Sequence, residues 1–159
     1  MRNILIVLIA LCVLPIAVAQ SSGSAASTQS VTVTLTSAQL QRLASSPVQF
    51  APAPGAGQMI YVLSSMAQYK AGSAPYVAQS GRLNVYTGNS GNTAGATPAL
   101  GFLDKGTSQV RLMGAPSSGD PQSSYENQAL MVTNDGATEW TNGDGTITMT
   151  VYYTVVALQ

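Results

Sequence analysis

The sequence predicts an all-β fold: an antiparallel β-sandwich or jelly-roll-like single domain with one short helix. Three observations predict it. About eight short stretches rich in Val, Ile, Thr and Tyr follow one another, separated by Gly, Pro, Asn and Asp. The last stretch begins with strict alternation of threonine and apolar residues from Thr146 to Val151. No long helical period lies between the stretches, as it would in a fold of parallel strands joined by helices.

The first two elements are a strand and a short helix. Val31 to Leu35 alternates between apolar and polar residues, which predicts a strand with one buried face. The period then changes over Ser37 to Ala44, where Leu40 and Leu43 lie three residues apart. We expect a short helix or helical turn there, capped by the hydroxyl of Ser37.

Two more strands follow before the middle of the chain. Val48 to Ala51 predicts a brief strand. It ends at Pro52 to Gly55, where two prolines restrict the backbone and the glycine after them allows a turn. Gln58 to Tyr69 is the longest apolar stretch of the middle region. Its part from Met59 to Leu63 is continuously apolar, so we expect a strand covered on both faces.

The third quarter of the chain alternates strands with polar loops. A strand is expected around Leu83 to Thr87, with Tyr86 on the face opposite Leu83. The small and polar residues from Gly88 to Pro98 predict a loop. Short strands are expected at Leu100 to Leu103 and at Gln109 to Met113, on either side of a turn.

The last quarter holds a second long polar loop and two strands. The loop covers Gly114 to Ser124, and a strand is expected at Gln128 to Thr133. In the final strand, which runs on to Leu158, the alternation from Thr146 to Val151 should point its apolar members, such as Met149, into the core.

The N-terminus resembles a secretory signal. Arg2 precedes an apolar run of about fifteen residues, which is short for a membrane span of roughly 20 residues. Ala17-Val18-Ala19 has the small-x-small pattern of a signal-peptidase site. We therefore expect residues 1–19 to be a signal peptide, 20–30 a flexible tether and 31–159 the β-sandwich domain. The alternatives are an uncleaved anchor or a buried N-terminal helix. The expected location is secreted, extracellular or periplasmic.

The composition excludes several function classes. The chain has no histidine, and its one cysteine, Cys12, lies within the expected signal. It therefore lacks the residues used most often for proton transfer, thiol catalysis and zinc binding. Charged residues make up 8% and the net charge is zero, so nucleic acid is not an expected partner. We expect no enzyme, no cofactor and no membrane contact after signal cleavage. A cysteine-free secreted domain fits a bacterial or phage origin.

Four residues near the C-terminus form the densest group of oxygen ligands, and they are weak candidates for a calcium site: Asp135, Glu139, Asn142 and Asp144. The chain has no D-x-D-x-D-G run. The segments Asn134 to Gly136 and Asn142 to Gly145 are also favourable hairpin turns, because their residues tolerate positive φ angles. The turn interpretation is the stronger one.

Three aromatic residues in or beside loops, Trp140, Tyr125 and Tyr76, are weak candidates for a sugar-stacking platform. Trp140 could equally close one end of the sandwich. For glycoside hydrolysis, Glu126 and Glu139 are the acids least typical of turns, but no pattern brings them together. We therefore assign no catalytic residue.

Several sequence segments together resemble those of a group of small β-rich proteins encoded by tailed bacteriophages. The segments are Leu35 to Leu40, Pro52 to Gly57, Tyr69 to Tyr76, Asn127 to Leu130, and Gly143 to Thr146 followed by Tyr152 to Val156. These proteins mostly have no assigned function, and some are taken as structural or decoration components of the virion. The resemblance spans most of Val31 to Leu158 and implies a non-enzymatic, particle-surface role. A secretory signal departs from that pattern, because virion proteins assemble in the cytoplasm.

The leading hypothesis is a secreted, non-catalytic β-sandwich that acts as a structural or assembly module. Its expected partners are further copies of itself or other particle or surface proteins, because a surface with few charges suits packing against copies. The alternative is a carbohydrate- or cell-surface-binding module that uses the loop aromatics.

Overall fold

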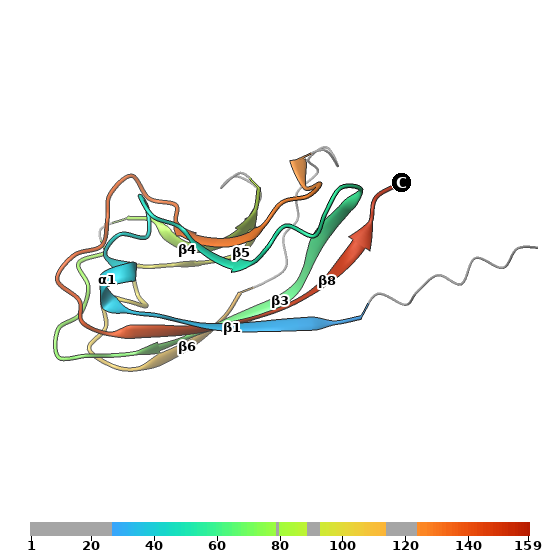
Figure 1. The fold of residues 1–159 in the computed structure, drawn as a ribbon. Helices are drawn as coiled ribbons and strands as arrows, with labels where there is room; N and C mark the ends of the chain where they lie inside the picture. Colours follow the sequence, from blue (N-terminus) through green and yellow to red (C-terminus); the bar gives the residue numbers. More distant parts are fainter. Residues whose placement is uncertain (1–26, 79, 89–92, 114–123) are drawn as a thin grey trace, which may run out of the picture.

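The structure is a computed structural model that describes residues 27–78, 80–88, 93–113 and 124–159 (Figure 1). The described part contains eight strands and one short helix, α1. Their bounds are β1 Gln29–Leu35, α1 Ser37–Leu40, β2 Val48–Ala51, β3 Gln58–Lys70, β4 Arg82–Thr87, β5 Thr93–Pro98, β6 Gln109–Met113, β7 Leu130–Asn134 and β8 Thr146–Ala157.

The strands form two four-stranded sheets, with order β1-β8-β3-β6 in sheet A and β2-β7-β4-β5 in sheet B. Every strand pair is antiparallel. Consecutive strands cross from one sheet to the other except at β4 and β5, and this arrangement of eight strands in two sheets is that of a jelly roll. The predicted fold class is therefore confirmed. Figure 1 shows the two sheets as two layers.

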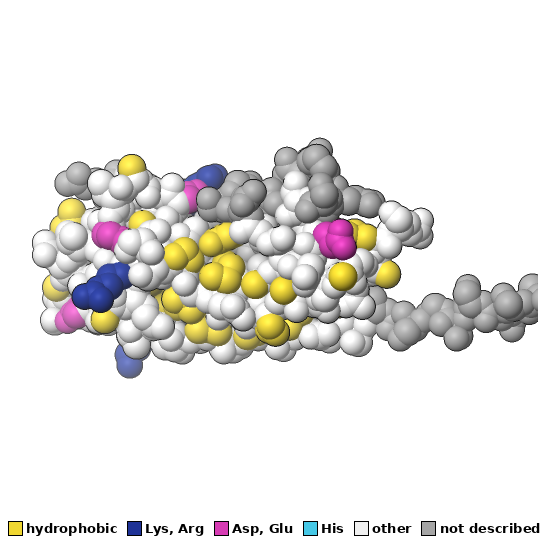
Figure 2. All heavy atoms as spheres, turned by 45° about the horizontal axis from the view of Figure 1, so that its top comes forward, with side chains coloured by type: hydrophobic (Ala, Val, Ile, Leu, Met, Phe, Trp, Pro, Cys, Tyr) yellow, Lys and Arg dark blue, Asp and Glu magenta, His cyan; other side chains and the backbone are white. Residues whose placement is uncertain are grey.

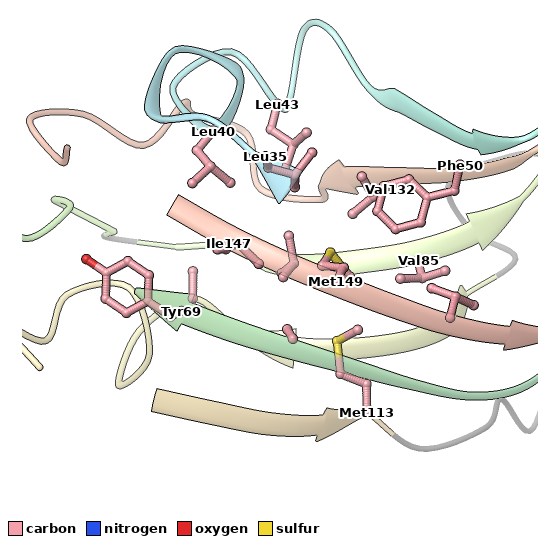
Figure 3. Packing of buried hydrophobic residues seen from close by; sticks show 14 of the residues in the cluster. Leu35, Leu40, Leu43, Phe50, Tyr69, Val85, Met113, Val132, Ile147 and Met149 are labelled. Atoms are coloured by element: carbon pink, nitrogen blue, oxygen red, sulfur yellow. The ribbon is translucent and has the colours of Figure 1, made fainter. Parts of the chain in front are cut away.

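The core lies between the sheets and is built from the inward side of each strand (Figure 3). Ile147, Met149 and Val151 of β8 are fully buried, as the alternation predicted. Val85 of β4 and Val132 of β7 face them from sheet B and are also fully buried. The period of two along β8 therefore separates a core face from an outer face that carries threonine.

The short helix packs Leu40 into the core, together with the nearby Leu43. Its N-cap is Thr36 and not the expected Ser37. The Thr36 side chain accepts a hydrogen bond from the Gln39 backbone N–H, and the Gln39 side chain accepts one from the Thr36 N–H. This reciprocal pair is a capping box, which a glutamine three residues after the cap makes possible.

Two sequence interpretations in the middle of the chain were wrong. Part of the segment expected to be a loop, Gly88 to Pro98, forms strand β5 from Thr93, because pairing with β4 overrides the weak strand preference of its Ala and Gly residues. Leu100 to Leu103 is a turn and not a strand. The Phe102 and Leu103 N–H groups both donate to the Ala99 carbonyl, and this buries both side chains.

Two further expectations need correction. β3 is covered on one face only: Ile60 and Val62 are buried, whereas Tyr61 and Leu63 are exposed. The segments Asn134 to Gly136 and Asn142 to Gly145 do not close hairpins, because β7 and β8 lie in different sheets. Both belong to the connection that crosses from sheet B to sheet A.

The expected signal of residues 1–19 and most of the tether lie outside the described residues, as does most of the loop expected at 114–124. β1 begins at Gln29, two positions before the expected start of the domain. Within the part of the chain that the structure describes, no helix has the length and apolar character needed to cross a membrane.

Candidate interaction surface

The three acidic members of the calcium candidates each bind a different segment of the chain. Asp135 accepts hydrogen bonds from the backbone and side chain of Arg82 at 2.7 Å, and pairs with its guanidinium at 2.6 Å. Glu139 accepts from the N–H groups of Ala44 and Ser45 at 2.9 and 2.7 Å. These two carboxylates thus anchor the β7–β8 connection to the start of β4 and to the segment before β2.

Asp144 anchors the same connection to the loop after β3. Its carboxylate accepts from the Ser73 hydroxyl at 2.5 Å and from the N–H groups of Ser73 and Ala74 at 3.0 and 2.9 Å. The hydrogen bond from the Ser73 hydroxyl, followed by those from the two N–H groups, lowers the pKa of Asp144. Asn142, the fourth candidate, has a φ of 65° and supplies a turn conformation that asparagine tolerates.

The described residues contain no group of three or more His, Cys, Asp or Glu side chains placed to hold a metal. The carboxylate oxygens of the candidates are instead taken up by N–H and O–H donors of the protein. Calcium binding at these residues stays a prediction. In the conformation described, an ion would have to displace those hydrogen bonds.

Two of the three candidate stacking residues lie in the core. Trp140 is 1% and Tyr76 is 2% exposed. The Trp140 indole N–H donates to the Ser80 carbonyl at 3.2 Å, and the Tyr76 hydroxyl donates to the Gly145 carbonyl at 2.7 Å. Sugar stacking on either ring would require this end of the sandwich to open. Tyr125 is half-buried in a turn.

Glu126 and Glu139 lie at opposite ends of the sandwich. Glu126 accepts from the Gly57 N–H at 2.7 Å, and the Gly57 carbonyl accepts from Leu158 beyond the end of β8. Glu139 lies before the start of β8 and binds the segment near α1. The 12 residues of β8 separate the two ends by about 40 Å at ~3.3 Å per residue. The two carboxylates cannot flank one glycosidic bond, which requires roughly 5 to 10 Å.

A hollow of about 390 Å³ lies beside Tyr86 and Thr133, on the side of sheet B away from the core. Several of its polar groups are already engaged. The Thr133 hydroxyl donates to the Leu43 carbonyl, and the Asn134 amide binds Thr138 and Gly136 in its own turn. Asp135, also in the lining, is held by Arg82. A ligand that used these groups would have to compete with the hydrogen bonds they already make.

Exposed apolar side chains are concentrated on one face of the molecule. Among the described residues, seven large hydrophobic side chains are exposed, and five of them belong to β3, β6 and β8 of sheet A. These five, which are between 42% and 83% exposed, are Tyr61, Leu63, Val110, Leu112 and Tyr152. Leu63 occupies the point where the β3–β8 register shifts. Large exposed apolar groups gathered on one face mark interaction surfaces more often than chance.

We call this surface the outer face of sheet A. It comprises Ser30, Thr32, Thr34, Tyr61, Leu63, Ser64, Met66, Gln68, Val110, Leu112, Thr148, Thr150 and Tyr152. The register places Thr32, Thr150, Met66 and Leu112 in one row across the four strands. None of these residues is charged. Lys70, the last residue of β3, is exposed on the same side of the sheet opposite Thr146 and forms one margin of this face.

The sequence does not predict this face, because the alternation in β6 is inverted. Val110 and Leu112 would be expected inside and Arg111 outside. In the structure Arg111 lies opposite the buried Ala67, its guanidinium is 5.8 Å from the centre of the Phe102 ring, and it donates to the Gly101 carbonyl. β6 is an edge strand, so Arg111 covers Phe102 and still reaches the rim of the sandwich.

No protein-family model matches the chain, and no curated protein matches it. Two solved structures are similar. One is described as the capsid asymmetric unit of cyanophage Pam1, with 14% identity, a TM-score of 0.40, and coverage of 91% of this chain and 93% of that chain. The other is a cryo-EM structure of mud crab tombus-like virus, with 9% identity, a TM-score of 0.26, and coverage of 100% and 94%. At these TM-scores the likeness carries no argument about function.

Proposed function

We propose that this chain is a non-catalytic structural protein that assembles with further copies of itself, and that the outer face of sheet A is a contact surface of that assembly. The observation that carries the proposal is the gathering of five exposed apolar side chains on a face whose charged side chain, Lys70, lies at its margin. Soluble monomers usually interrupt such faces with charged residues.

The chemistry of the face suits contact with an identical face. Within the residues that define the face, no charge has to be desolvated when two copies meet, and Lys70 at the margin can keep its ammonium group in water. The threonines pair with one another within the sheet: the hydroxyls of Thr32 and Thr150, and those of Thr34 and Thr148, are 3.0 Å apart. Their hydrogen bonds are therefore satisfied before a partner arrives, which lowers the cost of burying them.

The size of the face indicates weak individual contacts. Four strands at ~4.8 Å spacing, with about six residues each at ~3.3 Å, give an area of about 400 Å² per copy. A standard specific interface buries about 800 Å² per partner. A single contact of this kind would dissociate readily, so the proposal is an assembly in which several weak contacts per copy act together.

The experiment measures self-association by sedimentation velocity from micromolar to millimolar concentration. We expect the wild type to form oligomers and Leu112→Glu to shift them to smaller species. Leu100→Glu is the matched control, because Leu100 is also an exposed leucine, at 63%, but lies on the turn after β5. A wild type that stays monomeric throughout would overturn the proposal.

Export and association with a particle are a further part of the proposal. They are supported by the sequence of residues 1–19 and by the resemblance to small phage proteins. Mass spectrometry of sedimented particles and of clarified medium from the native source tests both. A peptide that begins at Gln20 and is abundant in particles is the expected result. An intact Met1 end would contradict cleavage, and protein found only in the medium would contradict particle association.

Carbohydrate binding is the second candidate, and one observation favours it. Tyr61 and Tyr152 lie on the outer face of sheet A, and both rings are almost half exposed. Aromatic rings with a polar tip are well suited to mixed polar and apolar ligands. A glycan-array screen followed by calorimetry tests this candidate. Binding that is lost in Tyr152→Ala and kept in Leu100→Ala would support it, and the absence of any glycan signal would count against it.

A further inference from the structure

Each sheet of the sandwich ends in two edge strands. These are β1 and β6 in sheet A, and β2 and β5 in sheet B. An edge strand presents N–H and C=O groups that can pair with another chain, and natural proteins usually block this with charge, proline, bulges or short length.

Three of the four edges carry such protection. β2 has only four residues, lies between Pro47 and Pro52, and has a register shift against β7. β5 contains Gly95, ends in Pro98, and pairs with β4 through another register shift. β6 has Arg111 at its centre, with the side chain on the inward side.

β1 has none of these features. Its seven residues, Gln29–Leu35, include no charge, no proline and no glycine. Four β-branched residues follow one another from Val31 to Thr34, which favours an extended strand. β1 pairs with β8 over its whole length without a register shift, so it is neither bent nor twisted away. It is the one described edge strand open to strand addition by these criteria.

We propose that β1 pairs antiparallel with β1 of a second copy, across a two-fold axis at Thr32. The inference rests on the proposed self-association and specifies one contact of it. The strand is self-complementary about Thr32. Val31 would lie opposite Val33 of the second copy, and Ser30 opposite Thr34. The two copies of sheet A would then form one continuous sheet of eight strands.

Both sides of the new pair would be chemically matched. On the inner side, Val31 and Val33 are only partly buried against the core, so valines from the second copy would complete their burial. On the outer side, threonine would face threonine, as Thr32 already faces Thr150 at 3.0 Å in the β1–β8 pair. No charge lies on the strand to repel its copy.

The surroundings of β1 also suit a second copy. β1 runs along the near rim of the sandwich in Figure 1. On the side seen in Figure 2, hydrophobic side chains form a band along the molecule, and most charged groups lie toward its ends. A partner with a charged strand would find few countercharges along this band, whereas an identical strand needs none.

Single cysteines test the geometry, because no cysteine occurs in the described residues. In the full chain with Cys12→Ser, Thr32→Cys would place two cysteines directly opposite each other. Directly opposite residues of an antiparallel pair have Cα atoms about 4.5 to 5.5 Å apart, within the disulfide range. We expect rapid formation of a covalent dimer under mild oxidation. Leu100→Cys, at a position that is also exposed but off the strand, should crosslink only slowly.

Crosslinking also separates edge pairing from stacking of outer faces. Stacked sheets lie about 10 Å apart, too far for a disulfide. If the wild type is oligomeric but Thr32→Cys crosslinks no faster than Leu100→Cys, the β1 contact is overturned and the proposed function stands. If the wild type is monomeric at every concentration, both are overturned.

A charge exchange tests the two-fold axis independently. Thr32→Lys and Thr32→Asp each place like charges opposite each other, so each variant alone should lose the dimer. An equimolar mixture should restore it, because lysine then faces aspartate. Thr32→Val, a neutral β-branched replacement, should keep it. Circular dichroism of each variant confirms that the fold is retained. A mixture that stays monomeric while Thr32→Val dimerises would place the contact elsewhere.

Discussion

The Asp144 carboxylate accepts a hydrogen bond of 2.5 Å from the hydroxyl of Ser73, a residue 71 positions earlier in the chain. Together with Glu139 and Asp135, it ties the β7–β8 connection to three other segments. This connection carries the chain from sheet B to sheet A. The acids that resemble a metal site in the sequence therefore hold one end of the sandwich closed.

The first prediction is that acid loosens this end. The pKa of Asp144 is lowered by the Ser73 hydroxyl and the Ser73 and Ala74 N–H groups. For Glu139, partial desolvation raises the pKa, but hydrogen bonds from Ala44 and Ser45 outweigh it and the net shift is downward. A carboxyl with a lowered pKa stabilises the fold above its unfolded pKa, and that stability is lost as pH falls through the folded pKa.

We therefore expect the Tm of the wild type to drop below about pH 4, near the unfolded pKa of these groups. Asp144→Asn and Glu139→Gln should each lower the Tm at neutral pH and flatten its dependence on pH. Calorimetric unfolding between neutral and strongly acidic pH measures both effects. Variants whose Tm falls with acid as steeply as that of the wild type would contradict this assignment.

The second prediction concerns Gly143, whose neighbour is the Tyr76 ring. A Cβ atom at Gly143 would overlap the ring atoms of Tyr76. Because the Tyr76 ring is buried and its hydroxyl donates a hydrogen bond to the Gly145 carbonyl, the side chain cannot move aside without losing these contacts. Gly143→Ala should cost about 1–3 kcal/mol or more by overpacking. Gly106→Ala is the matched control, since no atom lies within 4 Å of the added methyl. Equal stability of the two variants in urea unfolding would be the contrary result.

The third prediction contrasts two buried tyrosines whose ring centres are 6.4 Å apart. Tyr76→Phe removes the donor to the Gly145 carbonyl, and leaving a buried acceptor unpaired costs about 1–3 kcal/mol. The Tyr69 hydroxyl is buried and has no hydrogen-bond partner within the described residues. Tyr69→Phe should therefore be neutral or stabilising. Urea unfolding of both variants measures the difference, and a larger loss for Tyr69→Phe would refute it.

The strands with strong alternation were the predictable part of the fold. β1 and β8 combine β-branched residues with a period of two, and the structure follows that pattern closely. β5 was not predicted from the sequence, because Thr93–Pro98 contains mostly small residues and its strand conformation depends on pairing with β4. The conformation of a short segment with weak strand or helix propensity depends on its neighbours in the folded structure. A single sequence does not reveal which segments those neighbours are.

The interaction surface was less predictable than the fold. The exposed face depends on register, which places Leu112 of β6 beside Met66 of β3 although the two are far apart in sequence. In β6 the usual rule is reversed, since Arg111 lies on the inner side and its apolar neighbours point outward. The loop aromatics show the reverse case, in which residues considered for a surface site are buried. A tryptophan between turns can either bind a ligand or close the core, and its position in the sequence does not distinguish the two.

The last prediction settles the environment of Trp140 in solution. The chain has one tryptophan, so its fluorescence reports this side chain alone. Because Trp140 is 1% exposed and its N–H is bonded to the Ser80 carbonyl, its emission should be blue-shifted and protected from iodide. Unfolding in guanidinium should shift the emission to the red and expose it to the quencher. A native protein with red-shifted, readily quenched emission would mean that this end of the sandwich is open, and it would return Trp140 to the list of ligand-binding candidates.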